Sequence, residues 1–420
     1  MKKLSVFVFL SIIFSSCVST KRNLDNYLNE GKVYGDKQRH FGYLFIDTES
    51  GDTLLASNAN KYFVPASTTK LFTLYTSLNY IGDSLIGLQY TLKSDTLFIR
   101  GTGDPTFLHP SFGQNATLDF LKKHPKIILS EENNFQNSYG KGWMWDDALE
   151  YYQAEINSMP LYGNLIRNSG TTDSSLNLNP RFFQNWYTKT GSLGGFLRDE
   201  NLQILPSKLK WEVPFKTNLQ TSADLLSDTL GVTVGTEHGF DIAFENILLS
   251  VPKDTVLRKM MIESDNMLAE QLLLQSSLGL SDSLSSEKMI TYLLSNDLRD
   301  LPQKPRWVDG SGLSRYNLFS PADLTFVLEK MRNQIGLDRL IYYLPANGVN
   351  GTLKTFSSSV EPFIFAKSGS MSGVYNLGGY LRASSGRLIL FAVMNNNFTF
   401  PVSKIRNETA EFLQLVREKY

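Results

Sequence analysis

Residues 64–72 read VPASTTKLF and place the Ser67 hydroxyl and the Lys70 amine three residues apart. The stretch follows a proline and opens an apolar segment, which predicts a helix that ends near Gly82. Residues i and i+3 share one helix face, so the amine can lie beside the hydroxyl. A serine in the first turn also lies near the positive end of the helix dipole. The stretch therefore predicts a serine nucleophile that uses lysine as its base.

The Ser-x-x-Lys pattern becomes selective only through two later elements of the chain. The same spacing recurs at Ser138, Ser207, Ser250 and Ser285, so most copies are accidental. After Ser67, however, come residues 264–266, which read SDN, and then residues 367–369, which read KSG. These three elements in this order are typical of class A β-lactamases and penicillin-binding proteins.

The second and third elements have competing copies. Ser-x-Asn also occurs at Ser77 and Ser175, but only Ser264 interrupts an otherwise helical segment, where the same residues can cap a helix and face a cleft. Residues 189–191 read KTG, the commoner form of the third element. We favour Lys367 because it lies downstream of Ser264 and opens a strand region. A strand edge beside the serine can hold a substrate backbone in register.

Further segments extend the likeness to most of the chain. They are residues 103–106 (GDPT), 142–146 (GWMWD), 309–315 (DGSGLSR), 348–353 (GVNGTL) and 373–377 (GVYNL). From about Phe41 onward the chain resembles the low-molecular-mass penicillin-binding proteins, specifically the D-alanyl-D-alanine carboxypeptidase/endopeptidase family with an insertion after the serine helix. The separation of Ser67 from Ser264 is short for that group, which implies that one accessory domain is trimmed or missing.

The resemblance implies an α+β fold: a serine β-lactamase/DD-peptidase-like transpeptidase domain, with an antiparallel sheet flanked by helices, and an inserted β-rich domain. We expect the transpeptidase-like domain to comprise residues 22–87 and 239–420, and the inserted domain residues 88–238. Strand-like runs near both ends of the chain are expected to pair in one sheet. We expect Trp143 and Trp145 to anchor the core or the domain interface.

The resemblance also implies a role for each catalytic residue. Ser67 would attack the carbonyl between two D-alanines, and Lys70, kept partly neutral by its surroundings, would take the serine proton. Ser264 would relay that proton to the leaving amine, and Asn266 would hydrogen-bond the substrate amide.

The third element supplies the expected substrate-binding residues. Lys367 would hold the terminal carboxylate with help from the Ser368 hydroxyl, next to Gly369. The backbone N–H groups of Ser67 and Ser370 would form the oxyanion hole. Water would then release the acyl-enzyme, and neither a metal nor a cofactor is required. Residues 309–315 are expected to form a loop that supports the cleft, because two glycines follow an aspartate there.

The whole chain limits the class of protein and its compartment. Its length of 420 residues suggests two structural units. Its formal net charge is zero, so the charge gives no indication of nucleic-acid binding. Residues 1–17 combine two lysines, an apolar run and Cys17, which predicts a signal peptide with a lipidation site at its end. Cys17 is the only cysteine, so no intrachain disulfide can form. We expect an exported, periplasmic protein that is tied to a membrane only through lipid; the alternative is a signal peptide whose cysteine is discarded.

The predicted function is that of a serine D-Ala-D-Ala carboxypeptidase that acts on peptidoglycan stem peptides through an acyl-enzyme on Ser67 and binds β-lactams as inhibitors. Whether it also acts as a D,D-endopeptidase stays open, because both reactions use one acyl-enzyme. A serine β-lactamase is disfavoured, since no Glu-x-x-Leu-Asn lies between Asn266 and Lys367. A non-catalytic penicillin-sensing or wall-binding protein is disfavoured because every chemical group is present.

Overall fold

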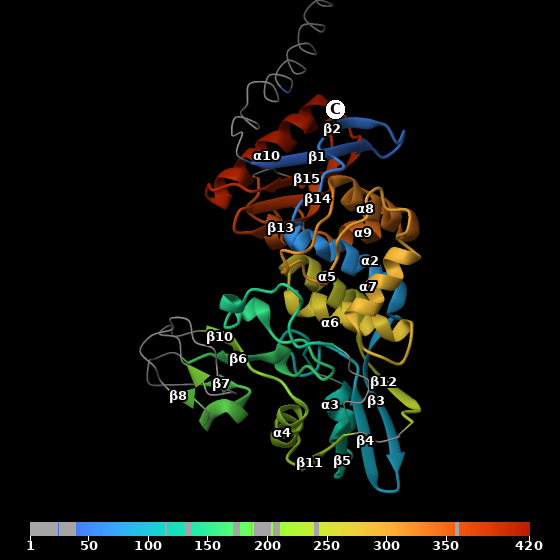
Figure 1. Ribbon diagram of the computed structural model, residues 1–420, viewed down its shortest axis with the longest axis vertical. Helices are drawn as coiled ribbons and strands as arrows, with labels where there is room; N and C mark the ends of the chain where they lie inside the picture. The colour runs from blue at the N-terminus through green and yellow to red at the C-terminus, as the bar shows by residue number, and fades with distance from the viewer. Residues whose placement is uncertain are drawn as a thin grey trace, which may run out of the picture.

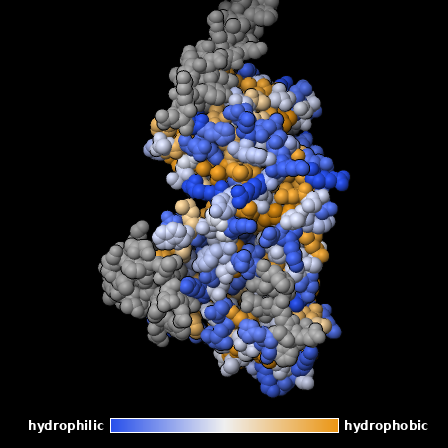
Figure 2. Space-filling model, in the orientation of Figure 1, coloured by the Kyte–Doolittle hydropathy of each residue, from blue (hydrophilic) through white to orange (hydrophobic). Residues whose placement is uncertain are grey.

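The computed structural model describes residue 24 and residues 39–113, 116–130, 136–170, 177–185, 187–188, 203–204, 211–238, 243–357 and 361–420. The molecule is elongated: one sheet lies at one end, helices occupy the middle and a second sheet lies at the other end (Figure 1). The visible face is largely hydrophilic, and its hydrophobic residues gather mainly at mid-height, over the helices (Figure 2). No helix among the described residues is both long and apolar enough to cross a membrane.

A five-stranded antiparallel sheet joins the two ends of the described chain. Its strand order is β13-β14-β15-β1-β2. The strands are β1 (His40–Asp47), β2 (Thr53–Ser57), β13 (Ile364–Met371), β14 (Val374–Arg382) and β15 (Leu388–Asn396). Because β1 pairs with β15, Phe45 lies opposite Phe391. The predicted sheet between the chain ends and the α+β class are confirmed.

The sheet is covered by helices on both faces. Successive residues of a strand point to opposite sides. Ala392 of β15 therefore packs with helices α2 (Lys70–Tyr80) and α8 (Pro321–Ile335), whereas Phe391 packs with α10 (Val402–Lys419). The same alternation turns Lys367 of β13 away from the side on which Ala366 packs.

The helical layer carries clear sequence signals at its helix starts. Its other helices are α5 (Lys253–Glu263), α6 (Asn266–Ser276), α7 (Ser286–Ser295) and α9 (Leu337–Tyr343). At the start of α8 the Ser320 hydroxyl accepts a hydrogen bond from the Asp323 N–H, and the Asp323 carboxylate accepts one from the Ser320 N–H. This capping box, with proline at the first helical position, accounts for the start of α8 at Pro321.

A second five-stranded sheet belongs to the inserted part of the chain. Its order is β11-β5-β4-β3-β12, with both parallel and antiparallel pairs. Its strands are β3 (Ser84–Lys93), β4 (Thr96–Gly101), β5 (Ile127–Ser130), β11 (Val234–Glu237) and β12 (Asn246–Pro252). Helices α3 (Ala116–Leu121) and α4 (Leu219–Leu230) share its core. The sheet thus includes residues on either side of the range 88–238.

Smaller elements complete the inserted part and the connections. Two short sheets contain β6 (Leu165–Asn168), β7 (Leu178–Asn179) and β10 (Trp211–Pro214), and β8 (Tyr187–Thr188) and β9 (Gln203–Ile204). The 3₁₀ turns are η1 (Ala66–Thr69), η2 (Trp145–Asp147), η3 (Tyr151–Gln153), η4 (Tyr162–Asn164), η5 (Arg181–Asn185), η6 (Ser277–Gly279) and η7 (Gly351–Leu353).

Candidate active site

Ser67 lies in the 3₁₀ turn η1, which runs directly into α2. The segment before it is fixed by side-chain amides from the sheet. Asn376 Nδ2 donates to the Val64 carbonyl at 2.9 Å and to the Pro65 carbonyl at 2.8 Å. Asn396 Oδ1 accepts from the Val64 N–H at 2.6 Å. The sheet therefore sets the position of Ser67 as well as covering the helix.

Lys70 is fully buried and makes three hydrogen bonds through Nζ. The distances are 3.1 Å to Ser67 Oγ, 2.7 Å to Asn266 Oδ1 and 2.9 Å to the Ser311 carbonyl oxygen. Burial lowers the Lys70 pKa to about 8, against the opposing effect of the carboxylates of Glu270, Asp265 and Asp309. An amine with this pKa can accept a proton from a neighbouring hydroxyl near neutral pH.

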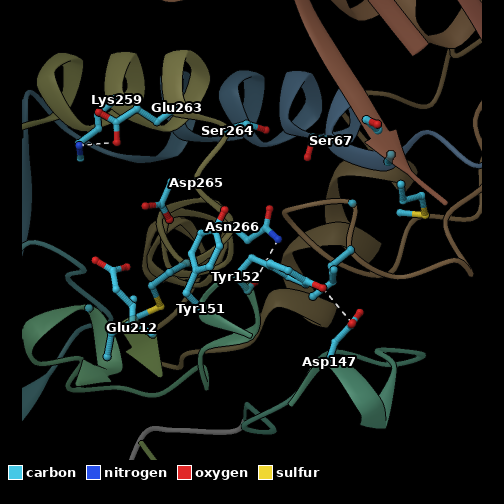
Figure 3. Close-up of a pocket in the computed structure, with 18 of the residues that line it drawn as sticks. Ser67, Asp147, Tyr151, Tyr152, Glu212, Lys259, Glu263, Ser264, Asp265 and Asn266 are labelled. Atoms are coloured by element: carbon cyan, nitrogen blue, oxygen red, sulfur yellow. Dashed lines mark hydrogen bonds and ion pairs between the residues drawn. The ribbon is translucent and has the colours of Figure 1, made fainter. Parts of the chain in front are cut away.

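The SDN segment forms the break between α5 and α6. Ser264 ends α5 in the left-handed conformation, with φ 60°. Asp265 caps α6, since its Oδ1 accepts from the Leu268 N–H at 2.9 Å. Asn266 begins α6, and its Nδ2 donates to the Tyr152 carbonyl at 3.0 Å, so the amide is held with its oxygen toward Lys70. The helix break thus turns the side chains of Ser264 and Asn266 toward Ser67 (Figure 3).

Lys367 is the second fully buried lysine of the site. Its Nζ donates to Ser264 Oγ at 2.8 Å and to the Ser368 carbonyl at 2.9 Å. Burial holds the Lys367 pKa well below its ordinary value, and the nearby Lys70 lowers it further. Ser368 Oγ donates to Thr352 Oγ1 at 2.7 Å, which ties β13 to the turn η7.

Gly369 lies where β13 approaches the serine turn most closely. A Cβ atom at this position would lie 2.4 Å from the Pro65 carbonyl oxygen and 3.0 Å from the Ser67 nitrogen. Only glycine therefore allows the strand to pass beside η1. The next residue, Ser370, is exposed and lines the cleft.

The 309–315 loop closes the site beneath Lys70. A Cβ atom on Gly312, which has φ 81°, would lie 1.8 Å from the Ala66 carbonyl oxygen. Asp309 organises the loop, because its carboxylate accepts from the N–H groups of Gly312 and Ser314 at 2.9 and 2.6 Å. Trp143 Nε1 also donates to Asp309, at 3.1 Å, so the inserted part contacts this loop.

The cleft in front of these residues has a volume of about 1160 Å³ and lies between the helical layer and the inserted part. Ser67, Ser264, Asn266 and Ser370 line it, whereas Lys70 and Lys367 lie behind the two serines. Around them the cleft is lined by residues that include Asp146, Asp147, Tyr151, Tyr152, Glu212, Lys259, Glu263 and Arg315 (Figure 3). His109 also lines it, but burial lowers the His109 pKa to about 3, so its imidazole is neutral at pH 7.

The structure brings all eight predicted catalytic and substrate-binding residues to one place. Cys17, the alternative motif at 189–191 and Ser175 lie outside the described residues. Within the described part of the chain, His, Cys, Asp and Glu side chains form no group that could hold a metal ion. The expectation for Trp145 is wrong: its side chain is 69% exposed, because it lies on a turn at the surface.

Ser311, whose carbonyl accepts from Lys70, lies in the loop that was expected to support the cleft. Three further contact residues were not predicted. Tyr152 and Thr352 act through a backbone carbonyl or a single hydroxyl and leave no pattern in the sequence. Glu270 did leave one, since it is the only charged residue inside the apolar stretch 267–274 and is 2% exposed. A buried carboxylate in such a helix needs partners, and this signals a site.

These features define a class. A serine at a helix start, a buried lysine one turn later and a second lysine on an antiparallel strand are the parts of a serine peptidase that uses lysine in place of histidine. The chain belongs to the D-Ala-D-Ala carboxypeptidase 3 (S13) family, whose model matches residues 20–179 and 243–416. It is accordingly a low-molecular-mass penicillin-binding protein and a serine-type D-Ala-D-Ala carboxypeptidase.

Individual relatives agree with this assignment. The chain is 23% identical to the D-alanyl-D-alanine carboxypeptidase DacB of Haemophilus influenzae over 90% of both chains. It is also 23% identical to the D-alanyl-D-alanine carboxypeptidase of Actinomadura sp. strain R39, over 86% of this chain and 78% of that one. The crystal structure of penicillin binding protein 4 (dacB) from H. influenzae matches 91% of this chain and 97% of its own, with a TM-score of 0.73 and 18% identity. That match shows the same fold.

Proposed function

We propose that Ser67 is the nucleophile and Lys70 its base in the hydrolysis of D-Ala-D-Ala. One observation carries this proposal: the buried Lys70 amine lies 3.1 Å from Ser67 Oγ and has a pKa of about 8. At pH 7 roughly a tenth of such amines are neutral. The neutral amine takes the serine proton while Oγ bonds to the carbonyl carbon of the penultimate D-alanine.

Ser264 and Asn266 are proposed to serve the leaving group and the substrate amide. The Ser264 hydroxyl gives its proton to the departing amine as the C–N bond breaks and receives in its place the proton held by Lys70, and terminal D-alanine leaves. Asn266 Nδ2 carries a second N–H beyond the one given to Tyr152, and this N–H can donate to a substrate carbonyl. Both residues line the cleft, which supports these roles.

Lys367, Ser368, Gly369 and Ser370 are proposed to bind the substrate from β13. The contacts of Lys367 Nζ are two neutral oxygens, so a bound terminal carboxylate would supply its counter-charge. Gly369 lets the strand pass close enough for the backbone N–H groups of Ser67 and Ser370 to meet the developing oxyanion. Each donor of this kind is worth about 3–4 kcal/mol in other serine enzymes. Water then hydrolyses the Ser67 ester and frees the enzyme.

We further propose that the enzyme cleaves D,D-cross-links, because the same acyl-enzyme forms whether the leaving amine belongs to D-alanine or to a second stem peptide. A solved protein from Bdellovibrio bacteriovorus, described as a predatory peptidoglycan endopeptidase, shares the fold with a TM-score of 0.52. Release of monomers from a purified cross-linked muropeptide dimer by the wild-type enzyme, and not by Ser67→Ala, tests this activity.

We also propose export to the periplasm, with the signal peptide cleaved just before Cys17 and Cys17 lipidated. The positive start, the apolar run and the small residues before Cys17 support this proposal. Residues 88–238 are proposed as the accessory domain of this exported enzyme, with the start of β3 and the whole of β12 completing its sheet from either side of that range. Palmitate labelling of the protein in cells, with Cys17→Ala as control, tests the lipid; label on both proteins, or on neither, would contradict it.

The experiment that tests the nucleophile is intact-protein mass after brief exposure to benzylpenicillin, followed over hours. We expect a long-lived adduct on the wild-type protein and none on a folded Ser67→Ala variant, which should also fail to release D-alanine from a pentapeptide. An adduct on the variant would refute the assignment. An adduct that vanishes within seconds while penicillin is consumed would indicate a β-lactamase.

A further inference from the structure

Glu270 is a buried carboxylate one helical turn after Asn266 on α6, and the proposed catalytic roles leave it without a function. Its two oxygens each accept one backbone N–H of the 309–315 loop. Gly310 donates to Oε2 at 2.9 Å, and Ser311 donates to Oε1 at 2.7 Å. Each of the two donors meets its own oxygen, and an amide would put an NH₂ donor in place of one of these oxygens. The carboxylate therefore fits this loop better than glutamine would.

The loop residue held by Glu270 is also a partner of Lys70. The N–H of Ser311 donates to Glu270, while its carbonyl accepts from Lys70 Nζ at 2.9 Å. From the other side, Thr73 Oγ1 of α2 donates to the Gly310 carbonyl at 2.6 Å. One short backbone segment is thus fixed between α6 and α2, and it presents one of the three acceptors that hold the Lys70 amine.

The charge of Glu270 also acts on Lys70, because it raises the pKa of the lysine amine. Lys70 faces Glu270 and Asp265 from α6 and its cap, Asp309 from the loop and Lys367 from β13. Glu270 contributes the largest of the three effects that favour the charged amine. Burial and the neighbouring Asp309 raise the Glu270 pKa, whereas the hydrogen bonds from Gly310 and Ser311 lower it and favour the carboxylate.

We propose that Glu270 is a positioning residue of the carboxypeptidase: by fixing the Gly310–Ser311 backbone it holds the Lys70 amine against Ser67. This inference rests on the proposed role of Lys70 as the base. It assigns a function to a group that contacts neither the substrate nor the reacting atoms. Without Glu270 the Ser311 carbonyl would be free to move, and the lysine would lose a fixed direction toward the serine.

The test is the second-order rate of acylation by benzylpenicillin, measured from pH 5.5 to 10 for the wild-type protein and Glu270→Gln. The acylation rate should rise with pH while Lys70 loses its proton (the rising limb of the profile) and then stay constant (the plateau). Misplacing a catalytic group by about 1 Å can cost about a hundredfold in rate, so we expect the plateau rate of Glu270→Gln to fall by about ten- to a hundredfold. Loss of the negative charge lowers the Lys70 pKa, so the rising limb should move to lower pH. A purely structural residue would not move that limb.

Glu270→Asp keeps the charge but is too short to reach both N–H groups. We expect its plateau to fall while its limb stays at the wild-type pH. If Glu270→Gln does not fold, a plateau that falls in Glu270→Asp but not in the control supports the positioning role, whereas a wild-type plateau refutes it. The matched control is Asp323→Asn, which removes charge from a fully buried carboxylate that also accepts two backbone N–H groups, from Gln303 at 3.0 Å and Ser320 at 2.9 Å. This control should lose stability and keep the wild-type limb.

The outcomes separate this inference from the proposed function. If Lys70→Met abolishes acylation while folded Glu270→Gln keeps the wild-type plateau and limb, the positioning role is refuted and the base assignment stands. A lowered plateau with an unmoved limb in Glu270→Gln, matched by Asp323→Asn, also refutes it. If Lys70→Met acylates at the wild-type rate, the base assignment itself fails.

Discussion

At the scale of single residues, the two buried lysines differ in what surrounds them. Lys70 faces three carboxyl groups that oppose the effect of burial, whereas the charged neighbour of Lys367 is Lys70 itself. Lys70 can therefore exchange a proton near neutral pH, while the hydrogen bonds of Lys367 within the described part of the chain go to neutral oxygens. This difference separates a base from a carboxylate receptor, although both residues are lysines with buried amines.

Acylation of Ser67 should accordingly speed up as pH rises. The Lys70 pKa is lowered from 10.5 to about 8, so the fraction of neutral amine, and with it the rate, should grow tenfold per pH unit below 8 and level off above it. Stopped-flow acylation by a chromogenic cephalosporin across this range measures the effect. A flat or falling profile would contradict Lys70 as the base.

The lowered pKa of Lys70 also makes the free energy of unfolding depend on pH. Between pH 8 and 10.5 the unfolded chain binds the Lys70 proton and the folded chain does not. The destabilising contribution of this lysine is thus fully present below pH 8 and declines as pH rises to 10.5. Lys70→Met should therefore stabilise the fold most below pH 8, as urea unfolding at pH 7 and pH 10 can show.

Lys367→Ala should discriminate between substrates by their terminal group. The lysine amine is proposed to meet the terminal carboxylate, so a substrate with a free carboxylate should lose more kcat/KM than a matching methyl ester. A charge-assisted hydrogen bond contributes about 1.5–3 kcal/mol, which corresponds to roughly a tenfold to a hundredfold difference between the two substrates. Equal losses would mean that Lys367 acts only on Ser264.

At the scale of elements, the site depends on one close approach between β13 and η1. Gly369→Ala would place a Cβ 2.4 Å from the Pro65 carbonyl, and both backbones are fixed by the sheet. We expect the strand or the turn to shift by about 1 Å, with a loss of acylation rate of up to about a hundredfold. Gly82→Ala is the matched control, because its nearest neighbour would lie 4.0 Å away. Wild-type acylation by Gly369→Ala would show that this contact yields.

Elements with local signals were the ones that the sequence predicted. Ser67 and Lys70 lie within one turn of the predicted helix, so no long-range contact is needed to recognise them. The 2.8 Å contact of Lys367 with Ser264 joins residues 103 positions apart, and only the order of motifs suggested it. The pairing of β3 with β12 was not predicted, because the turn-rich sequence between them hides which strands meet.

At the scale of the whole molecule, α6 joins the catalytic part to the inserted part. Its first residue, Asn266, donates to the Tyr152 carbonyl, and its Gln275 donates to the Ile86 and Thr102 carbonyls at 2.9 and 3.2 Å. Gln271 lies between them and is fully buried. The helix that carries the SDN asparagine on its first turn therefore also forms the interface with the inserted part.

Gln271→Ala should weaken this interface, lower the stability of the protein and slow acylation at the site. Gln271 Nε2 donates to the Gly103 and Asn157 carbonyls at 3.1 and 2.8 Å, and its Oε1 accepts from the Asn157 N–H at 3.2 Å. Each buried backbone group left without a partner costs about 1–3 kcal/mol, so we expect at least about 2 kcal/mol of destabilisation in urea. Penicillin acylation should slow as well, because the 152–157 segment also holds the Asn266 amide.

The control is Gln220→Ala. Gln220 is exposed, and its side chain bonds to Asp224 within α4 and to Thr236 beside it, so its loss should change stability by less than about 0.5 kcal/mol. If Gln271→Ala matched this control in both stability and acylation, the inserted part would be a passive appendage and not a support for the site.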